Sequence, residues 1–259
     1  MRNSAFIFRL IVDYRQIVVH ALVMRTVERK AQEVAERERM LVRLALEMVD
    51  RDGFHDLNLG KLAAESGYSK GTVYNHFTCR EDLLIELSAE SARRQVRYFQ
   101  AIADLPWGGV WALYGLALAY MRHAEVAPVL FEVSITARTD SVCAVASEER
   151  LKRRDLVESQ MMQIVGAVVE RAAVEGPFDN PHASPAIAVD SLRAYILGYA
   201  AMHLLSTRFV WSALEESQSR LPVLASVVSG LGWPRLEADD LVCIQQVIVG
   251  VVDSASGWQ

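Results

Sequence analysis

The spacing of apolar residues is the feature that most constrains the fold, because it repeats every three or four positions over long stretches. One such stripe consists of Leu41, Ala45, Met48 and Val49, which lie on the same face of an α-helix. The 259-residue chain has only 14 glycines and 7 prolines, with no proline before Pro106. Strands of even spacing joined by hairpin turns are missing. We therefore predict an all-α fold.

Capping residues and breakers divide the chain into a series of predicted helices. Gly53 and Gly67 are expected helix stops, Asn58 and Ser69 are expected N-caps, and Thr78 followed by Glu81 fits a capping box. The predicted helices cover residues 26–51, 59–66, 69–77, a longer stretch from 78 onward, and about 108–123, 126–137, 144–174, 184–212 and 237–254. Pro222 and the sequence Gly232-Trp233-Pro234 indicate an irregular segment between the last two.

Residues 6–24 are rich in Ile and Val, but their apolar positions recur at helical spacing. This favours an amphipathic helix packed on the body of the protein or on a partner. One alternative is an anchor at a membrane surface, which the weakly basic polar face disfavours. Another is that the natural chain begins at Met24. The segment lacks the continuous apolar core of a signal peptide, so we expect no export and a cytoplasmic location.

Two short helices joined through Gly67, in a frame from Asn58 to Phe77, fit the geometry of a helix-turn-helix. The residue string is LGKLAAESGYSKGTVYNHFTCREDLLIEL, and it resembles the DNA-binding domain of the TetR family of bacterial transcriptional regulators. The resemblance covers about residues 35–90. It implies an N-terminal helix-turn-helix three-helix domain, followed by a larger C-terminal helical ligand-binding and dimerisation bundle.

The expected domain organisation follows from this frame. Residues 1–32 are a helical N-terminal extension, residues 33–83 are the helix-turn-helix DNA-binding domain with its motif at 58–77, and residues 84–259 are the ligand-binding and dimerisation domain.

The candidate DNA contacts gather around the two short helices. Helix N-termini capped by Asn58 and Ser69 suit phosphate, the first turn after Ser69 is the part that enters the major groove, and the amide of Asn75 suits adenine. The resemblance adds Tyr74, His76 and Arg80 as phosphate contacts. The expected DNA-binding set is Asn58, Ser69, Lys70, Gly71, Thr72, Tyr74, Asn75, His76 and Arg80, with Val73 and Phe77 assigned to the core.

Charge is distributed unevenly along the chain. The formal net charge is −5, but residues 1–97 carry 16 Lys and Arg against 14 Asp and Glu, whereas the rest carries 11 against 18. The small excess of base therefore lies with the helix-turn-helix. We expect DNA affinity to depend on a dimer with a few well-placed donors and to weaken strongly with salt.

The C-terminal half contains many aromatic and methionine residues that can form the core and also line a pocket for a mostly apolar ligand. The candidate ligand contacts are Trp111, Tyr114, His123, Phe131, Met162, Tyr199 and His203. The resemblance implies a small-molecule effector and a homodimer through the helices near 184–212 and 237–254. Small residues (Ala194, Gly198, Ala200 and Ala201) and an apolar stripe (Leu241, Ile244, Ile248, Val251 and Val252) suit such an interface. A two-fold dimer requires a near-palindromic operator of double-stranded DNA.

The leading hypothesis is a sequence-specific DNA-binding transcriptional regulator, released from DNA as a repressor by its ligand. We expect no enzyme, no cofactor, no metal site and no membrane partner, because catalytic and phosphate-loop motifs are missing and the three cysteines show no metal-ligand spacing. The alternative is a helical small-molecule-binding protein or enzyme that retains a non-functional helix-turn-helix.

Overall fold

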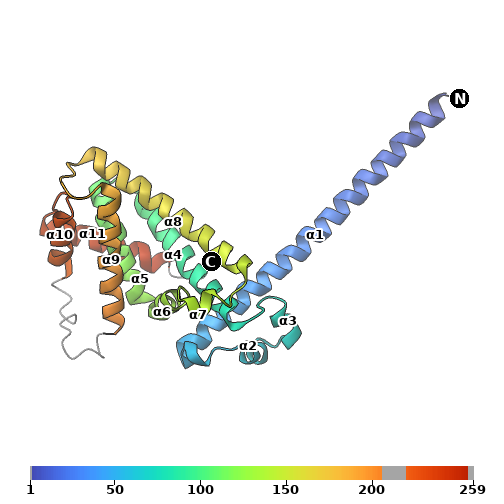
Figure 1. Cartoon of the computed structure of the whole chain (residues 1–259). Coiled ribbons are helices and arrows are strands. Elements are labelled where there is room, and N and C mark those ends of the chain that lie inside the picture. The colour runs from blue at the N-terminus through green and yellow to red at the C-terminus, as the bar shows by residue number, and fades with distance from the viewer. Residues whose placement is uncertain (1, 206–219, 256–259) are drawn as a thin grey trace. The chain divides into compact units, whose positions relative to one another are not determined.

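The computed structural model describes residues 2–205 and 220–255, with side chains from residue 27 onward, and every element in these ranges is a helix (Figure 1). The all-α prediction is therefore confirmed. The chain divides into two compact units, Met1–His76 and Phe77–Gln259.

The first unit contains α1 (Arg2–Asp52), the 3₁₀ turn η1 (Phe54–Asp56), α2 (Leu59–Ser66) and α3 (Lys70–Tyr74). The backbone of α1 is one continuous helix, whereas the sequence suggested separate segments at 6–24 and 26–51. The predicted stops occur where glycine takes a positive φ, 81° at Gly53 and 73° at Gly67. Such angles are costly for residues with a Cβ.

Both predicted N-caps of the short helices are present. Asn58 Oδ1 accepts the backbone N–H of Lys61 at 2.9 Å, and Ser69 Oγ accepts that of Thr72 at 3.1 Å. Each bond satisfies one of the N–H groups that a helix start leaves without a partner. The caps therefore fix the starts of α2 and α3, although α3 ends at Tyr74, three residues before the predicted end.

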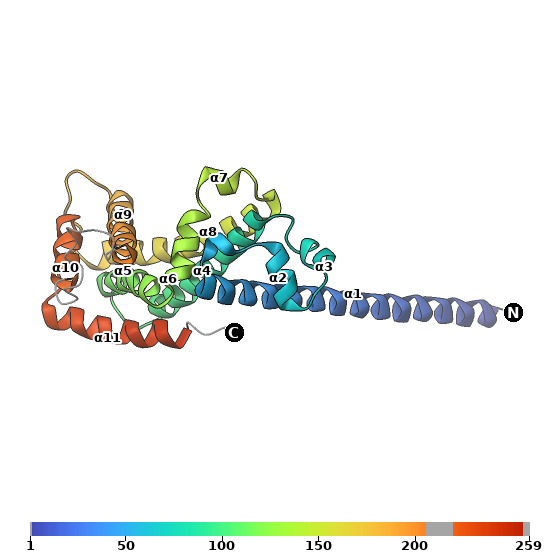
Figure 2. The same cartoon turned by 90° about the horizontal axis from the view of Figure 1, so that it is seen from below.

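The second unit is a bundle of helices (Figure 2). Its helices are α4 (Arg80–Ala103), α5 (Gly109–Val126), α6 (Pro128–Thr136), α7 (Asp140–Cys143), α8 (Glu148–Glu175), α9 (Pro185–Leu204), α10 (Arg220–Gly230) and α11 (Ala238–Ala255). The helices α4, α5 and α8 pack on one another, and α11 packs on α5. At Gly109 a Cβ would lie 2.2 Å from the backbone nitrogen of Ala172, so glycine permits the close approach of α5 and α8.

Three helix boundaries differ from the sequence predictions. The predicted helix at 144–174 corresponds to α8, which begins at Glu148, and a separate short helix, α7, ends at Cys143. Residues around Pro222 form α10, since proline is tolerated in the first turn of a helix. The predicted helix at 184–212 corresponds to α9, which ends at Leu204, and residues 206–212 of that prediction lie outside the described residues.

The predicted capping box at the start of α4 uses a different acid. Asp82 Oδ2 accepts the backbone N–H of Thr78 at 3.0 Å and its hydroxyl at 2.7 Å, and Asp82 Oδ1 accepts the N–H of Ser147 at 2.7 Å. Cys79, not Thr78, is the N-cap residue. Glu81 was therefore the wrong choice, and the buried Asp82 also joins α4 to the segment that precedes α8.

The apolar stripe of α11 does not form a free face. Its members Leu241, Ile244, Ile248 and Val252 are at most 2% exposed and belong to the core of the bundle. Ala200 on α9 is also buried, at 1%. These positions were expected to suit a dimer interface, but the periodicity that identified them reflects packing within the chain.

Candidate functional site

The first candidate surface is formed by the two capped helix starts of the first unit. Ser69, Lys70, Gly71 and Asn75 are exposed, and Tyr74 is 50% exposed although it is a large aromatic residue. The side chain of Val73 is fully buried, which confirms its assignment to the core. The short helix α3 thus separates a buried anchor from an exposed polar face, as a recognition helix must.

Asn58 and Thr72 complete this surface. Asn58 is exposed at the start of α2, and its side-chain nitrogen donates to the Asp56 carbonyl at 3.2 Å. Thr72 is half-buried, with its hydroxyl 2.9 Å from Ser69 Oγ. Both side chains are therefore held by local hydrogen bonds, so their groups are positioned before any phosphate arrives.

The remaining two predicted DNA contacts, His76 and Arg80, are partly or largely buried. The side chain of His76 is only 5% exposed, and its Nδ1 lies 3.3 Å from Glu38 Oε2 on α1. The imidazole therefore faces into the first unit, because an acidic partner is available there. Arg80 belongs to the second unit as the first residue of α4, and its side chain is half-buried. Phe77 is fully buried, as predicted.

Two exposed residues next to this surface were missed by sequence reasoning. Lys61 is exposed in the first turn of α2, 3.8 Å from Asp56. Tyr68 is 37% exposed in the turn, and the guanidinium of Arg37 lies 5.3 Å from its ring centre. Lys61 could have been found from its place three residues after the N-cap Asn58.

Gly71 has no packing role within the chain. A Cβ at this position would meet only Ser69 Oγ, at 3.8 Å, and the backbone φ is negative. Glycine within a helix costs about 0.5–1 kcal/mol relative to alanine. Packing among the described residues therefore does not require glycine at position 71.

The second candidate site is an apolar groove in the bundle. It contains about 580 Å³ of space, part of it open to solvent, and it lies between α4, α5, α8 and α9. Its lining residues are Phe99, Leu113, Leu116, Ala117, Tyr120, Met161, Met162, Val165, Val189, Asp190, Leu192, Arg193 and Ile196. The apolar character of this lining is typical of small-molecule sites.

Polar groups in the groove are few. Asp190 and Arg193 form an ion pair at 3.2 Å, and both side chains are more than half exposed. Burial raises the pKa of Tyr120 to about 12, so its phenol stays protonated at neutral pH. The groove therefore offers a mostly apolar wall with an exposed charged pair and one neutral hydroxyl.

Of the predicted ligand contacts, only Met162 lines the groove. Trp111 packs edge-on against Trp107, and Tyr114 is fully buried with its hydroxyl 3.4 Å from the Pro234 carbonyl. Tyr199 and His203 stack on each other, with ring centres 6.5 Å apart.

The remaining predicted contacts lie behind the groove. Phe131 packs edge-on against Tyr120, and His123 is fully buried. The groove's other lining residues follow helical spacing on α5, α8 and α9, a signal present in the sequence, but choosing those faces requires the packing of four helices.

A network of charged side chains joins α4 to the start of α8, and Glu86 and Arg150 within it are buried. Arg150 Nη1 donates to Glu86 Oε2 at 2.6 Å, and Arg93 Nη2 donates to Glu86 Oε1 at 2.6 Å. The Arg150 guanidinium also lies 4.8 Å from the ring centre of Phe77. Helix α8, which lines the groove further along its length, is thus fixed to the part of α4 that directly follows the helix-turn-helix in the chain.

Metal and membrane features are missing from the described residues. Ranges 2–205 and 220–255 contain no group of three or more His, Cys, Asp or Glu side chains arranged to hold a metal ion. Within these same ranges, no helix is both long enough and apolar enough for a bilayer span.

A match to a known family covers the part of the chain that carries the first candidate surface. Residues 41–87 match the family described as bacterial regulatory proteins, tetR family. The chain carries a TetR-family helix-turn-helix domain. The fatty acid metabolism regulator protein of Bacillus subtilis (strain 168) is 34% identical over 50 residues, which cover 19% of this chain and 26% of that protein. The match thus spans about a quarter of the length of this curated relative.

Solved structures extend the likeness to the TetR fold as a whole. A protein of unknown function from Rhodococcus sp. RHA1 has a TM-score of 0.59 at 18% identity, covering 75% of this chain and 95% of its own. The fatty acid degradation regulator FadR from Bacillus halodurans has a TM-score of 0.57 at 16% identity, covering 76% and 97%. A TetR/AcrR-family transcriptional regulator from Thermobifida fusca has a TM-score of 0.51 at 19% identity, covering 76% and 96%. These similarities confirm the predicted architecture.

Proposed function

We propose that the protein is a sequence-specific DNA-binding transcriptional regulator, acting as a repressor that a small, mostly apolar effector releases from DNA. The observation that carries this proposal is the exposed surface formed by the starts of α2 and α3. It presents Lys70, Tyr74 and Asn75 beside two capped helix N-termini, where backbone N–H groups and the helix dipole favour phosphate. Gly71 adds a position at which a DNA backbone can approach closely.

A homodimer would place two recognition helices on one near-palindromic operator. We place its interface on the outer faces of α9 and α11. On α9, Ala194, Leu197 and Gly198 are exposed, and on α11 so are Val242 and Gly250. No atom lies within 4 Å of a Cβ built on either of these glycines. Small residues on exposed helix faces permit close packing of a second helix, so this surface replaces the buried stripe named in the sequence analysis.

The apolar groove is the proposed effector site. Two of the similar proteins are named as regulators of fatty acid metabolism and of fatty acid degradation, which supports an apolar ligand here. Helix α8 supplies Met161, Met162 and Val165 to the groove and Arg150 to the contact with Glu86 on α4. A ligand that shifts α8 therefore also acts on the start of α4. Moving a population from 99% to 1% DNA-competent requires about 5.5 kcal/mol of differential affinity.

The DNA-binding part is tested by a gel-shift titration with DNA adjoining the protein's own gene at two salt concentrations. We expect specific binding that weakens with salt, because phosphate contacts release counterions. Lys70→Ala combined with Tyr74→Ala should abolish it. Lys152→Ala is the matched control, because this lysine is also exposed but lies on α8. Absence of specific binding by the wild type, or equal binding by the double variant, contradicts the proposal.

The dimer is tested by introducing a bulky charge at Gly198. Gly198→Arg should give a monomer in size-exclusion chromatography and lose operator binding, while the melting temperature of the bundle stays close to wild type. Gly166→Arg is the control, since it also lies mid-helix with nothing within 4 Å of its Cβ position. A Gly198→Arg protein that remains dimeric shows that this surface is not the interface.

A further inference from the structure

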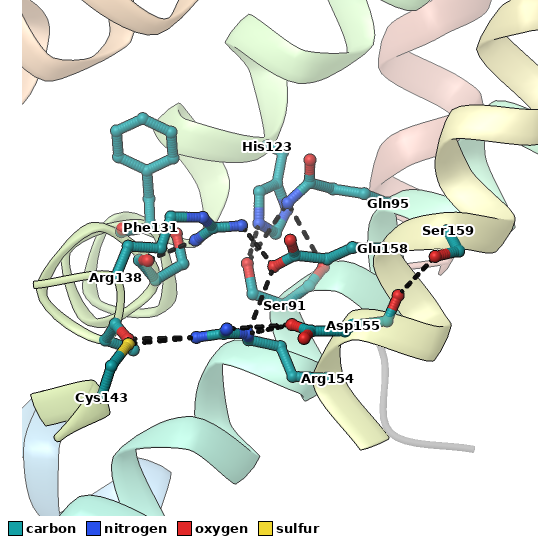
Figure 3. Close-up of polar contacts among 12 residues, drawn as sticks. Ser91, Gln95, His123, Phe131, Arg138, Cys143, Arg154, Asp155, Glu158 and Ser159 are labelled. Carbon is teal, nitrogen blue, oxygen red and sulfur yellow. Dashed lines mark hydrogen bonds and ion pairs between the residues drawn. The ribbon is translucent and has the colours of Figure 1, made fainter. Parts of the chain in front are cut away.

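Three polar side chains meet in the interior of the bundle between α4 and α5. Ser91 Oγ lies 2.9 Å from His123 Nε2, and Gln95 Nε2 donates to Ser91 Oγ at 3.4 Å (Figure 3). Gln95 is 6% exposed and the other two are fully buried. We call Ser91, Gln95 and His123 the buried polar cluster.

The hydrogen bonds within this cluster leave polar atoms without partners. His123 Nδ1 and Gln95 Oε1 are buried and make no hydrogen bond with any described residue, and the same holds for Ser88 Oγ one turn earlier on α4. Each such atom costs about 1–3 kcal/mol. Native proteins retain few unpaired buried polar groups, and those that remain call for a role.

The cluster lies about one helical turn from the groove along both α4 and α5. Helices α4 and α5 run antiparallel, since Ile102 packs at Gly115 and Ser91 bonds to His123. On α4, Phe99 lines the groove, and Gln95 lies one turn nearer the helix start. On α5, Tyr120 lines the groove and His123 lies three residues further. The step from groove to cluster is therefore about 6 Å along α4 and about 4.5 Å along α5.

The protonation state of His123 determines what the cluster can bind. Burial, with a smaller contribution from the charge of Arg94, lowers the pKa of His123 to about 3, so the ring is neutral at physiological pH. If Gln95 donates to Ser91 and Ser91 donates to His123 Nε2, the ring proton is on Nδ1. The cluster then offers one donor, His123 Nδ1–H, and one acceptor, Gln95 Oε1.

We propose that the buried polar cluster binds the polar end of the effector, and that this end is an uncharged hydroxyl group on an elongated apolar molecule. A hydroxyl accepts from His123 and donates to Gln95, so it satisfies both atoms together. An ionised carboxylate fits less well, because it has no proton to give Gln95 and the neighbouring Arg94 already pairs with Glu90 at 3.2 Å. The inference deepens the proposed function and depends on the groove being the effector site.

Entry to the cluster involves the aromatic residues at the inner end of the groove. Gln95 and His123 do not themselves line the groove, whereas Phe99 and Tyr120 do. The hydroxyl must pass these rings, so their side chains rotate on binding. The apolar body of the ligand then lies along Leu116, Met161 and Val165.

The test uses the full chain and three probes of similar size. Decan-1-ol and 1-methoxynonane are isomers that differ in their ability to donate a hydrogen bond, and decanoate adds a charge. Isothermal titration at pH 7.5 should give decan-1-ol an affinity at least about 5-fold higher than its isomer, since a net hydrogen bond contributes about 1 kcal/mol. Decanoate should bind more weakly than decan-1-ol.

Substitutions in the buried polar cluster test whether it causes the preference for alcohol over ether. His123→Phe and Gln95→Leu should bring the affinity ratio of alcohol to ether close to 1, with ether binding unchanged. His203→Phe is the matched control, because it removes a histidine that stacks on Tyr199 and is not a member of the cluster, and it should keep the ratio. Thermal melts separate binding from folding, and loss of the unpaired polar atoms predicts equal or higher melting temperatures for the two cluster variants.

The outcomes distinguish this inference from the proposed function. If alcohol and ether bind equally to the wild type, the cluster is filled by water or serves structure alone, and this inference is overturned while the groove stands. If the cluster variants keep the preference for alcohol, the hydroxyl is recognised elsewhere and the inference is again overturned. If none of the probes binds, both the groove as the effector site and this inference are overturned. The gel shift tests DNA binding independently of that result.

Discussion

Asp82→Asn tests the connection between the start of α4 and the start of α8. The carboxylate is 1% exposed and accepts three hydrogen bonds, two from Thr78 and one from the backbone N–H of Ser147. Asparagine has nearly the same shape, but it replaces one acceptor oxygen with an NH₂ group. The NH₂ group then faces either the two donors of Thr78 or the backbone N–H of Ser147, and two donors cannot form a hydrogen bond.

The expected loss follows from the number of bonds broken. Hydrogen bonds to a charged group contribute about 1.5–3 kcal/mol each, and the substitution removes one or two of them while retaining part of the geometry. We therefore expect a destabilisation of about 2–4 kcal/mol. For a domain of this size, that corresponds to a fall in melting temperature of roughly 4–16 °C.

The pH dependence gives a second, independent readout. Burial alone would raise the pKa of Asp82, but hydrogen bonds from Ser147 and Thr78 outweigh it and hold the pKa below the ordinary value. A lowered folded pKa means that the stabilisation is complete above the ordinary pKa of about 3.9 and is lost as the pH falls through the folded value. Asp82→Asn should therefore weaken the acid dependence of stability below about pH 4.

The assay is thermal melting followed by circular dichroism at 222 nm, at pH 7, 5, 4 and 3. Asp190→Asn is the control, since that carboxylate is 63% exposed in a surface ion pair, and such pairs contribute at most about 1 kcal/mol. If Asp82→Asn melts within 1 °C of wild type at pH 7, the three hydrogen bonds do not stabilise the bundle as argued.

Three further predictions concern the capped helices and the buried histidine. Ser69→Ala should destabilise the first unit by about 0.5–2 kcal/mol in urea unfolding, because it removes the cap on Thr72; no change contradicts the capping role. Gly71→Ala should stabilise that unit by about 0.5–1 kcal/mol, since a Cβ has room in the free protein. The same substitution should weaken operator binding in a gel shift. Unchanged DNA affinity would argue against close approach of the DNA backbone. The pKa of His123, about 3 when folded against 6.5 ordinarily, means that only the unfolded chain takes up a proton as the pH falls from 6.5. Wild-type stability should therefore decrease by up to about 1.4 kcal/mol per pH unit between pH 6.5 and 4.5, and His123→Phe should show a shallower slope in melts across that range.

Local chemistry made much of the first unit predictable. Asn58, Gly67 and Ser69 identify helix boundaries because capping and positive φ depend on a few neighbouring residues and on little else. The same locality explains why Val73 was placed in the core correctly. The burial of His76 beside Glu38 was not predicted, because Glu38 lies 38 positions away and no local pattern indicates that contact.

The bundle was less predictable because apolar periodicity identifies a helix face but not its partner. The stripe at Leu241, Ile244 and Ile248 was expected at a dimer interface, yet these residues pack inside the chain. Met162 was the one predicted ligand contact found in the groove. A groove between four helices depends on which faces leave a gap when the helices pack.

The sequence alone determined the helical class and the capped, glycine-punctuated frame of the helix-turn-helix, because these rest on interactions within a few residues. Tertiary structure decided the contact of Asp82 with Ser147, the course of the groove and the unpaired atoms of His123 and Gln95. Those features depend on contacts between segments far apart in the chain, where burial changes both the free energy and the protonation state of a side chain.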